Sequence, residues 1–264
     1  MPYNPFIKIL LSPNFALGHV VEWMIDPVFM EAEPYTYEVE VSGSPKFDEI
    51  AYTFPSTTDF MAIDTTNSKQ AVSVDTYYRI KLTTSDRNTY YSNTLLFGSD
   101  LEDRRRYHMA SEIVRKELLR MRKFTGVEGY LLKQKPFGKV RKDSVDPISG
   151  VPVVDTTVDF GTGIDGGYFA PLKIMISYED YQSSRVLNQE GLGTSDTVDI
   201  SFRTLGFPLV ESRDIIVDTR ADQRFIVKRS APVIFPGTSL ILTQKLDTSL
   251  LPYSDNIYKI VINK

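Results

Sequence analysis

The sequence has no cysteine, only two histidines and a single tryptophan among its 264 residues. The absence of cysteine excludes disulfide bonds, thiolate zinc sites and cysteine nucleophiles. No window approaches the ~20 consecutive apolar residues of a membrane-spanning helix, so we expect no membrane partner. The first residues, MPYNPFIKILLSPNF, also lack the charged start and the continuous apolar core of a secretory signal.

Neither sign of charge dominates, because 30 basic residues stand against 34 acidic ones and the net charge is -4. This balance gives no global argument for a nucleic acid or an anionic membrane as partner. The distribution along the chain is uneven. Residues 1–98 hold 6 basic and 12 acidic residues, residues 99–142 hold 13 and 6, and residues 143–264 hold 11 and 16. A basic island therefore lies between two acidic flanks.

Residues that commonly carry catalysis are few and dispersed. A metal or acid–base site would need His19 and His108 to converge with a carboxylate, but the two histidines lie in different segments. We therefore expect both histidines to be solvated. No serine lies in a GxSxG elbow. Five aspartates of one region could bind calcium, but they lack the alternation of an EF-hand loop and are common turn residues. They are Asp143, Asp146, Asp155, Asp159 and Asp165. We expect no enzyme and no cofactor.

The N-terminal region alternates between apolar and polar side chains, as half-buried strands do. In YTYEVEVSGS, for example, Tyr35, Tyr37 and Val39 share one face. Further short strands are predicted at FDEIAYTF, DFMAIDTT, TYYRIKLTT and TYYSNTLLF, with turn-forming residues between them. Their regular spacing predicts a β-sandwich over residues 1–98.

A helical period replaces this alternation over residues 99–130. Ser99 or Asp100 can cap a helix that ends at Gly126, after about seven turns. The apolar stripe is Tyr107, Ala110, Ile113, Val114, Leu118 and Met121. The other face is basic: Arg104, Arg105, Arg106, Arg115, Lys116, Arg120, Arg122 and Lys123. It could contact DNA phosphates without reading sequence, but the acidic flanks favour an acidic surface on a neighbouring subunit.

Residues 131–264 return to predicted strands and form a β-rich domain with long loops, so the predicted fold class is mainly β. The strands are GYLLKQKP, PLKIMISY, TVDISFRTL, DIIVDT, RFIVKRSAPVIF, SLILTQKL and IYKIVIN. The long loop between the first two strands is rich in Gly and Asp, and its length is typical of functional or interface loops.

The stretch VDFGTGIDGGYFAPL, residues 158–172, could cradle a phosphate or serve an assembly. It does not match GxGxxG and is followed by a predicted strand, whereas a phosphate loop needs a helix N-terminus. We therefore expect a loop with several left-handed backbone positions, at which glycine is favoured. An aromatic pair, Tyr168 and Phe169, stands at its exit.

The strand order of the N-terminal region resembles a fibronectin type III domain. Trp23 lies in the early strand VVEWMID, where that family places its core tryptophan. The stretch TYYRIKLTTSDRNTYYSNTLLF, which includes Ser92, looks like the last two strands of the family, with SDRN in place of the usual glycine of the turn.

Most of residues 99–264 resembles a family of virion structural proteins found around the neck and connector of tailed bacteriophages. The segments that carry this resemblance are RRRYHMASEIVRKELLRMRKFTGVEGYLLKQKPFG, DPISG, FGTGIDGGYFAPL and RADQRFIVKRSAPVIFPGTSLILTQKL. The resemblance implies a non-enzymatic protein of the neck or collar, assembled in the host cytoplasm into a ring-like homo-oligomer. Neighbouring neck, portal or tail proteins are the further partners that it implies.

Many members of that family have two CxxC clusters in the long loop. The corresponding positions here are Arg141 with Ser144 and Thr156 with Asp159, so we expect no metal. The expected interface residues are Arg104, Arg105, Arg106, Arg115, Arg120, Gly166, Gly167, Tyr168 and Phe169. Two alternatives remain, namely a host-surface or carbohydrate-binding adhesion module and a hydrolase whose site forms between subunits.

Overall fold

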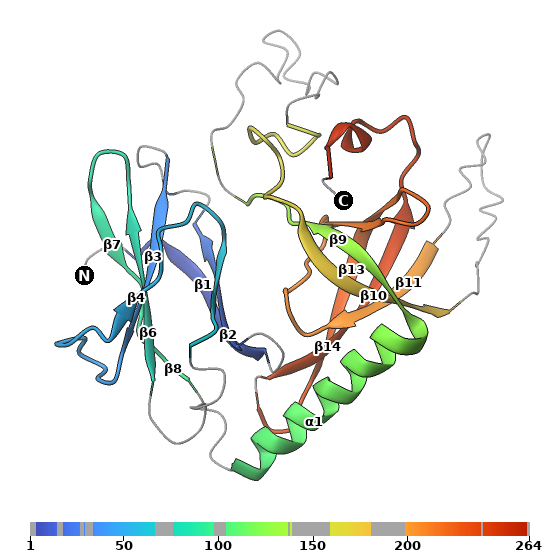
Figure 1. The fold of residues 1–264 in the computed structure, drawn as a ribbon. Helices are drawn as coiled ribbons and strands as arrows, with labels where there is room; N and C mark the ends of the chain where they lie inside the picture. The colour runs from blue at the N-terminus through green and yellow to red at the C-terminus, as the bar shows by residue number, and fades with distance from the viewer. Residues whose placement is uncertain are drawn as a thin grey trace, which may run out of the picture. The chain divides into compact units, whose positions relative to one another are not determined.

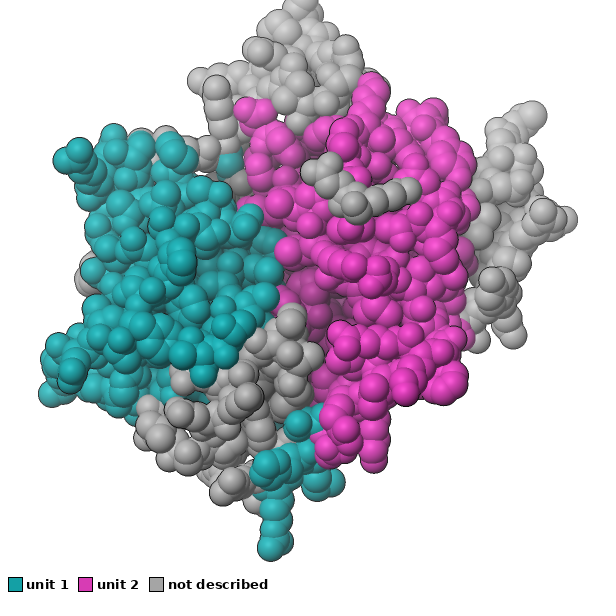
Figure 2. Space-filling view, in the orientation of Figure 1, with its two compact units in different colours: residues 1–111, 136–139, 238–240 teal, residues 112–135, 140–237, 241–264 magenta. Residues whose placement is uncertain are grey.

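The computed structural model describes residues 4–14, 18–26, 29, 34–66, 76–97, 104–136, 138, 159–180, 199–238 and 240–262. The chain forms two compact units (Figures 1 and 2). Unit 1 comprises residues 1–111, 136–139 and 238–240, and unit 2 comprises residues 112–135, 140–237 and 241–264. The predicted fold class is confirmed in that the chain is mainly β with one long helix.

The described residues of unit 1 form eight short strands arranged in two antiparallel sheets (Figure 1). The strands are β1 (Phe6–Asn14), β2 (Gly18–Ile25), β3 (Thr36–Ser42), β4 (Tyr52–Thr53), β5 (Met61–Asp64), β6 (Tyr77–Thr83), β7 (Thr89–Tyr91) and β8 (Leu95–Leu96). One sheet has the order β1-β2-β5, and the other has the order β4-β3-β6-β7 with β8 also paired to β6.

The two sheets of unit 1 share one hydrophobic core. Tyr37 and Val39 of β3 and Trp23 of β2 are all buried in it, and the rings of Trp23 and Tyr37 lie 5.2 Å apart. The predicted apolar face is therefore confirmed for Tyr37 and Val39, whereas the alternation does not continue to the end of β3, because Glu40 and Ser42 are buried too. Each such side chain stabilises the fold by about 1.5–3 kcal/mol relative to an exposed position.

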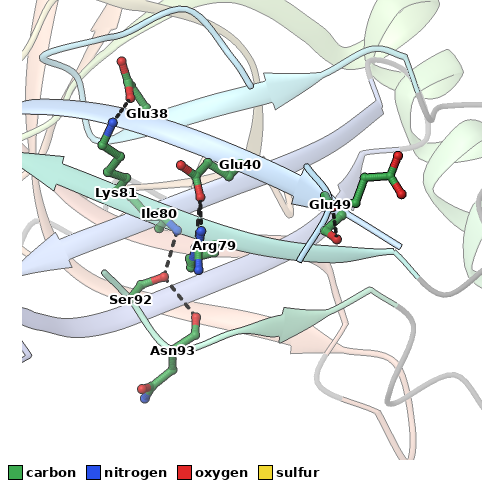
Figure 3. A network of polar contacts seen from close by, with 9 residues as sticks. Glu38, Glu40, Glu49, Arg79, Ile80, Lys81, Ser92 and Asn93 are labelled. Atoms are coloured by element: carbon green, nitrogen blue, oxygen red, sulfur yellow. Dashed lines mark hydrogen bonds and ion pairs between the residues drawn. The ribbon is translucent and has the colours of Figure 1, made fainter. Parts of the chain in front are cut away.

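Opposite charges face each other across β3 and β6 on the outer side of the larger sheet (Figure 3). Lys81 Nζ lies 2.8 Å from Glu38 Oε2, and Arg79 Nε donates to Glu40 Oε2 over 3.0 Å. Lys81 and Glu38 are partly exposed, whereas the side chain of Glu40 is only 7% exposed. Because water reaches the Glu40 carboxylate less than that of Glu38, loss of the cationic partner should destabilise the fold more at Glu40 than at Glu38.

The guanidinium group of Arg79 lies between two aromatic rings. Its Cζ is 4.3 Å from the centroid of Phe47 and 4.4 Å from the centroid of Tyr91. Phe47, the first residue of the strand predicted at FDEIAYTF, has φ 56°, a left-handed backbone conformation that is incompatible with an extended strand. Only Tyr52 and Thr53 of that predicted strand form β4.

Ser92 connects the edge of β6 to the segment between β7 and β8 (Figure 3). Its Oγ accepts from Ile80 N over 2.8 Å and donates to Asn93 O over 2.9 Å. Its backbone N also donates to Ile80 O over 2.9 Å. The serine thus continues the pairing of β6 where β7 has already ended.

The predicted helix is present as α1 (Arg104–Arg120), which continues without a break into a π-helical turn, η1 (Met121–Thr125). Ala110, Val114 and Met121 are buried, as the apolar stripe predicted. Ile113 is 42% exposed, so its assignment to the stripe was wrong; it lies at the border of the stripe, beside the basic face. The predicted caps Ser99 and Asp100 fall outside the described residues.

Gly126 ends the helix as predicted, but for a different physical reason. Its φ of -94° is open to any residue. A Cβ at this position would lie 2.6 Å from the carbonyl oxygen of Met121. The helix therefore passes directly into strand β9 (Gly126–Leu132) because a residue without a side chain permits this close approach.

Unit 2 is a closed antiparallel barrel with the strand order β10-β11-β14-β13-β12-β9 (Figure 1). Its further strands are β10 (Leu172–Asp180), β11 (Asp199–Leu205), β12 (Ile215–Asp218), β13 (Gln223–Ile234) and β14 (Ile241–Leu250). The segment IYKIVIN was predicted as a strand, which is wrong: η3 (Asn256–Lys259) is a 3-10 helix whose first turn is capped by Asp255.

The barrel is packed inside and covered on part of its outside. Phe202 and Phe225 are fully buried inside it, with ring centroids 5.0 Å apart. On the outer face, Ile215 of β12 packs in a second cluster with Ile257 of η3 and Tyr168 of the glycine-rich loop. We call this second group of residues the outer cluster.

Candidate functional site

The glycine-rich loop has the left-handed positions that the sequence predicted. They are Phe160 (φ 50°), Gly161 (79°), Gly163 (76°), Gly166 (75°) and Gly167 (55°). At Gly167 a Cβ would also lie 2.7 Å from the carbonyl oxygen of Asp159. The prediction for Gly166 and Gly167 is thus confirmed at the level of the backbone.

Hydrogen bonds hold this loop in shape and attach it to the end of β9. Thr162 Oγ1 donates to Asp159 O over 2.7 Å inside the loop. Lys135 N donates to Gly167 O over 3.0 Å, and Phe169 N donates to Lys133 O over 2.9 Å. Strand β10 follows at Leu172–Asp180, so the loop leads into no helix N-terminus that could bind a phosphate.

The aromatic pair at the loop exit packs within its own chain. Phe169 is 8% exposed, and Lys135 Nζ lies 5.9 Å from the centroid of its ring. Tyr168 is partly buried in the outer cluster, and this burial raises its pKa to about 12. The proposed role of both rings in a subunit contact stays a prediction, and little surface of Phe169 is left for it.

Of the positions that correspond to cysteine in the phage family, the structure describes Asp159 alone. Asp159 is 1% exposed, and its Oδ1 accepts from Gly161 N over 3.3 Å. Arg141, Ser144 and Thr156 lie outside the described residues, as do Asp143, Asp146 and Asp155. Within the described ranges, no group of three or more His, Asp or Glu side chains could hold a metal ion.

Two arginines of the basic helix are paired within the helix itself. Arg115 Nη2 lies 3.0 Å from Glu112 Oε2, and Arg120 Nη2 lies 2.6 Å from Glu117 Oε1. The hydrogen bond from Arg115 is the main cause of the lowered pKa of Glu112. The Arg115–Glu112 pair is exposed to water, which screens the attraction between its charges, so it adds little stability. Arg105 and Arg106 are exposed, and the side chain of Arg104 is not described.

The end of the helix carries a feature that the sequence reading missed. Phe124 in η1 is 82% exposed, and its neighbours Arg122 and Lys123 are exposed too. Neither cation forms an ion pair with any residue in the part of the chain that the structure describes. We call Arg122, Lys123 and Phe124 the η1 surface. The signal in the sequence was an aromatic residue directly after two cations and off the apolar stripe.

The barrel unit also presents a surface with an exposed tyrosine, the exposed Asp222 and the half-buried Asp255. Tyr253 is 64% exposed, and its ring centroid lies 5.0 Å from that of Tyr258. The charges of Asp222 and Asp255 both act on Arg224, which places them near one another. We call Tyr253, Asp222 and Asp255 the Tyr253 surface. Figure 1 shows the C-terminal end of α1 and the red C-terminal segment at different ends of the barrel.

His19 is buried, so the prediction that it is solvated was wrong, whereas His108 is exposed as predicted. His19 Nδ1 lies 2.7 Å from Tyr78 Oη, which donates to Asp64 Oδ2 over 2.8 Å. Burial lowers the pKa of His19 to about 4, against the opposing effect of the Asp64 charge. Asp64 and Tyr78 are 0% exposed, so this cluster is a buried structural network with no access for a substrate.

No helix in the described ranges is both long enough and apolar enough to span a membrane. Comparison of the chain with protein-family models, with curated proteins and with solved structures found no match.

Proposed function

We propose that this chain is a non-enzymatic structural protein of a tailed-phage virion that forms a ring at the neck or collar through contacts between copies. The observation that carries the proposal is the order of segments from the basic helix through the glycine-rich loop to the closing strands. The fold supports the proposal in one respect. Backbone hydrogen bonds attach the loop with the sequence GTGIDGGY to the closed barrel, so the loop has the fixed shape that a structural role requires.

We further propose that unit 1 is a fibronectin type III-like sandwich. Its support is the arrangement of three strands, β1-β2-β5, against the order β4-β3-β6-β7, with one core between them. Trp23 on the second strand is a core residue, as the resemblance implies, and Tyr78 on β6 lies in the same core.

The contact between copies is assigned to the η1 surface of one copy and the Tyr253 surface of the next. Two cations and an aromatic ring would face two carboxylates and an aromatic ring, which makes the surfaces complementary in charge and chemistry. Since the two surfaces differ, the contact is head-to-tail, and a head-to-tail contact closes into a ring when the rotation between copies permits.

The experiment compares the assembly state of the wild type with that of a Lys123→Glu variant by native mass spectrometry and electron microscopy. We expect Lys123→Glu to shift the ring to smaller species and a second change, Asp222→Lys, to restore it. Lys173→Glu is the matched control, because Lys173 is exposed in the same unit and pairs only with the exposed Glu128 among the described residues. A wild-type chain that stays monomeric, or is absent from purified particles, refutes the proposal.

The adhesion alternative has one observation in its favour. Tyr91 is 46% exposed on the outer face of the larger sheet, beside Arg79. Exposed aromatic rings beside polar groups can bind sugars, so full-length protein on a glycan array tests this function. Binding that is lost in Tyr91→Ala would favour adhesion over assembly.

A further inference from the structure

Lys133 lies at the end of β9 with its amine in an almost closed environment. The residue is 8% exposed. Its Nζ donates to Leu209 O over 2.9 Å and to Glu211 Oε2 over 3.0 Å. It also lies 3.3 Å from Asp214 Oδ2. An amine, a buried carboxyl and a second carboxylate therefore meet at one point of the barrel.

Asp214 is held by the backbone on both of its oxygens. Its Oδ1 accepts from Gln134 N over 2.9 Å, and its Oδ2 accepts from Glu211 N over 2.8 Å. The residue is 1% exposed, and this burial raises the pKa of its carboxyl, against the opposing charge of Lys133. Two fixed N–H donors can stabilise negative charge on a carboxyl oxygen when a nucleophile adds to the carbon.

We propose that Lys133 Nζ and Asp214 Cγ become joined by an intramolecular isopeptide bond. The neutral amine attacks the carbon of the protonated carboxyl, the N–C bond forms, and one C–O bond breaks. One molecule of water leaves, because the neutral amine loses one hydrogen and the carboxyl loses its hydroxyl group. No oxidation or reduction takes place, and no co-reactant is needed.

Glu211 is placed to transfer the protons of this reaction. Its carboxylate can accept a proton from the Lys133 ammonium and return a proton to the departing hydroxyl. The side chain of Glu211 is 39% exposed, against 10% for Lys133 and 2% for Asp214. The proton carrier thus reaches solvent while the two reacting groups do not.

The fold holds the amine of Lys133 and the carboxyl of Asp214 next to each other, whereas free amines and acids in water meet only by diffusion. Lys133 follows Leu132 of β9, and Asp214 precedes Ile215 of β12, and these two strands are paired through Leu132 and Ile215. Groups held together in this way react as if at effective concentrations of ~10⁵–10⁸ M. The bond would link two neighbouring strands covalently at the end of the barrel, a property that does not depend on the proposed role in a virion.

The test is the intact mass of the purified full-length chain, followed by peptide mapping. We expect a mass lower than that of the sequence by one water, and a branched tryptic peptide that joins Lys133 to Asp214. Water can also be lost by succinimide formation, for which Asp165 before Gly166 is a candidate. Lys133→Arg distinguishes the isopeptide bond from a succinimide, because it removes the reactive amine and keeps the charge. This variant should have the full mass, with circular dichroism confirming its fold.

A second variant, Glu211→Gln, tests the proton transfer. We expect it to cross-link at least ~100-fold more slowly, as is typical for loss of a general acid–base group. The readout is the fraction of cross-linked chain at equal times after synthesis. A wild-type mass equal to that of the sequence, or a mass loss that persists in Lys133→Arg, overturns the isopeptide bond. Unchanged cross-linking in Glu211→Gln overturns the role of Glu211.

Discussion

Removal of the Arg79 side chain tests how much the ion pair between Arg79 and the buried Glu40 stabilises unit 1. In Arg79→Ala the carboxylate of Glu40, whose side chain is 7% exposed, loses its ion-pair partner. Breaking a buried pair on one side costs about 3–5 kcal/mol, and each cation–π contact adds ~0.5–2 kcal/mol. Because the side chain of Arg79 is itself 22% exposed, water offsets part of this loss. We expect the free energy of unfolding of unit 1 to fall by about 3 kcal/mol.

Two further variants separate the charge from the stacking. Arg79→Lys keeps the positive charge but loses the planar group between Phe47 and Tyr91, so we expect a smaller cost of about 1–2 kcal/mol. Adding Glu40→Gln to Arg79→Ala should recover about 1 kcal/mol, because no unpaired charge then remains buried.

Urea unfolding monitored by tryptophan fluorescence measures these effects. Trp23 is the single tryptophan and is 4% exposed in the core of unit 1, so its emission reports the unfolding of that unit. Lys81→Ala is the matched control: it removes a cation from the same strand, but one whose pair with Glu38 is more exposed, and should cost less than about 1 kcal/mol. Equal costs for Arg79→Ala and Lys81→Ala would refute the reasoning.

Three more predictions concern other parts of the chain. The lowered pKa of His19 means that the unfolded state binds more protons than the folded state below the ordinary value of 6.5, so the stability of unit 1 should fall as the pH decreases from 6.5 to about 4. The loss should reach about 3 kcal/mol and be absent in His19→Gln, as urea unfolding at several pH values would show. Gly167→Ala should destabilise unit 2 by more than Gly161→Ala in calorimetry, because both have a left-handed φ but only Gly167 has a backbone oxygen 2.7 Å from the new Cβ. Phe169→Ala should lower the stability of unit 2 by about 3 kcal/mol, since it empties a buried site; loss of assembly with unchanged stability would contradict the intrachain packing.

Local periodicity was sufficient to predict most strands and the helix. It also contained a signal for His19 that was not used, because His19, Val21, Trp23 and Ile25 alternate along β2 and therefore share a face. The buried histidine could have been placed in the core from this spacing. Its partners Asp64 and Tyr78 could not, because they come from distant strands.

Closure of the barrel was beyond what periodicity can show. It depends on β9 pairing with both β10 and β12, and a strand carries no local mark of how many partners it has. The error at IYKIVIN has a related cause. Its β-branched residues are typical of strands, but Asp255 caps a helical turn there and Ile257 packs on the outside of the barrel.

The direct passage from η1 into β9 at Gly126 restricts how the length of the chain can vary. A helix turns by about 100° per residue, and the side chains of a strand alternate with a period of two. One inserted residue would move Leu131 from the interior of the barrel to the position of Leu132 in the outer cluster, and it would also rotate the helix relative to the strand. Related sequences should therefore keep the number of residues between Met121 and Leu132 constant, while tolerating insertions elsewhere.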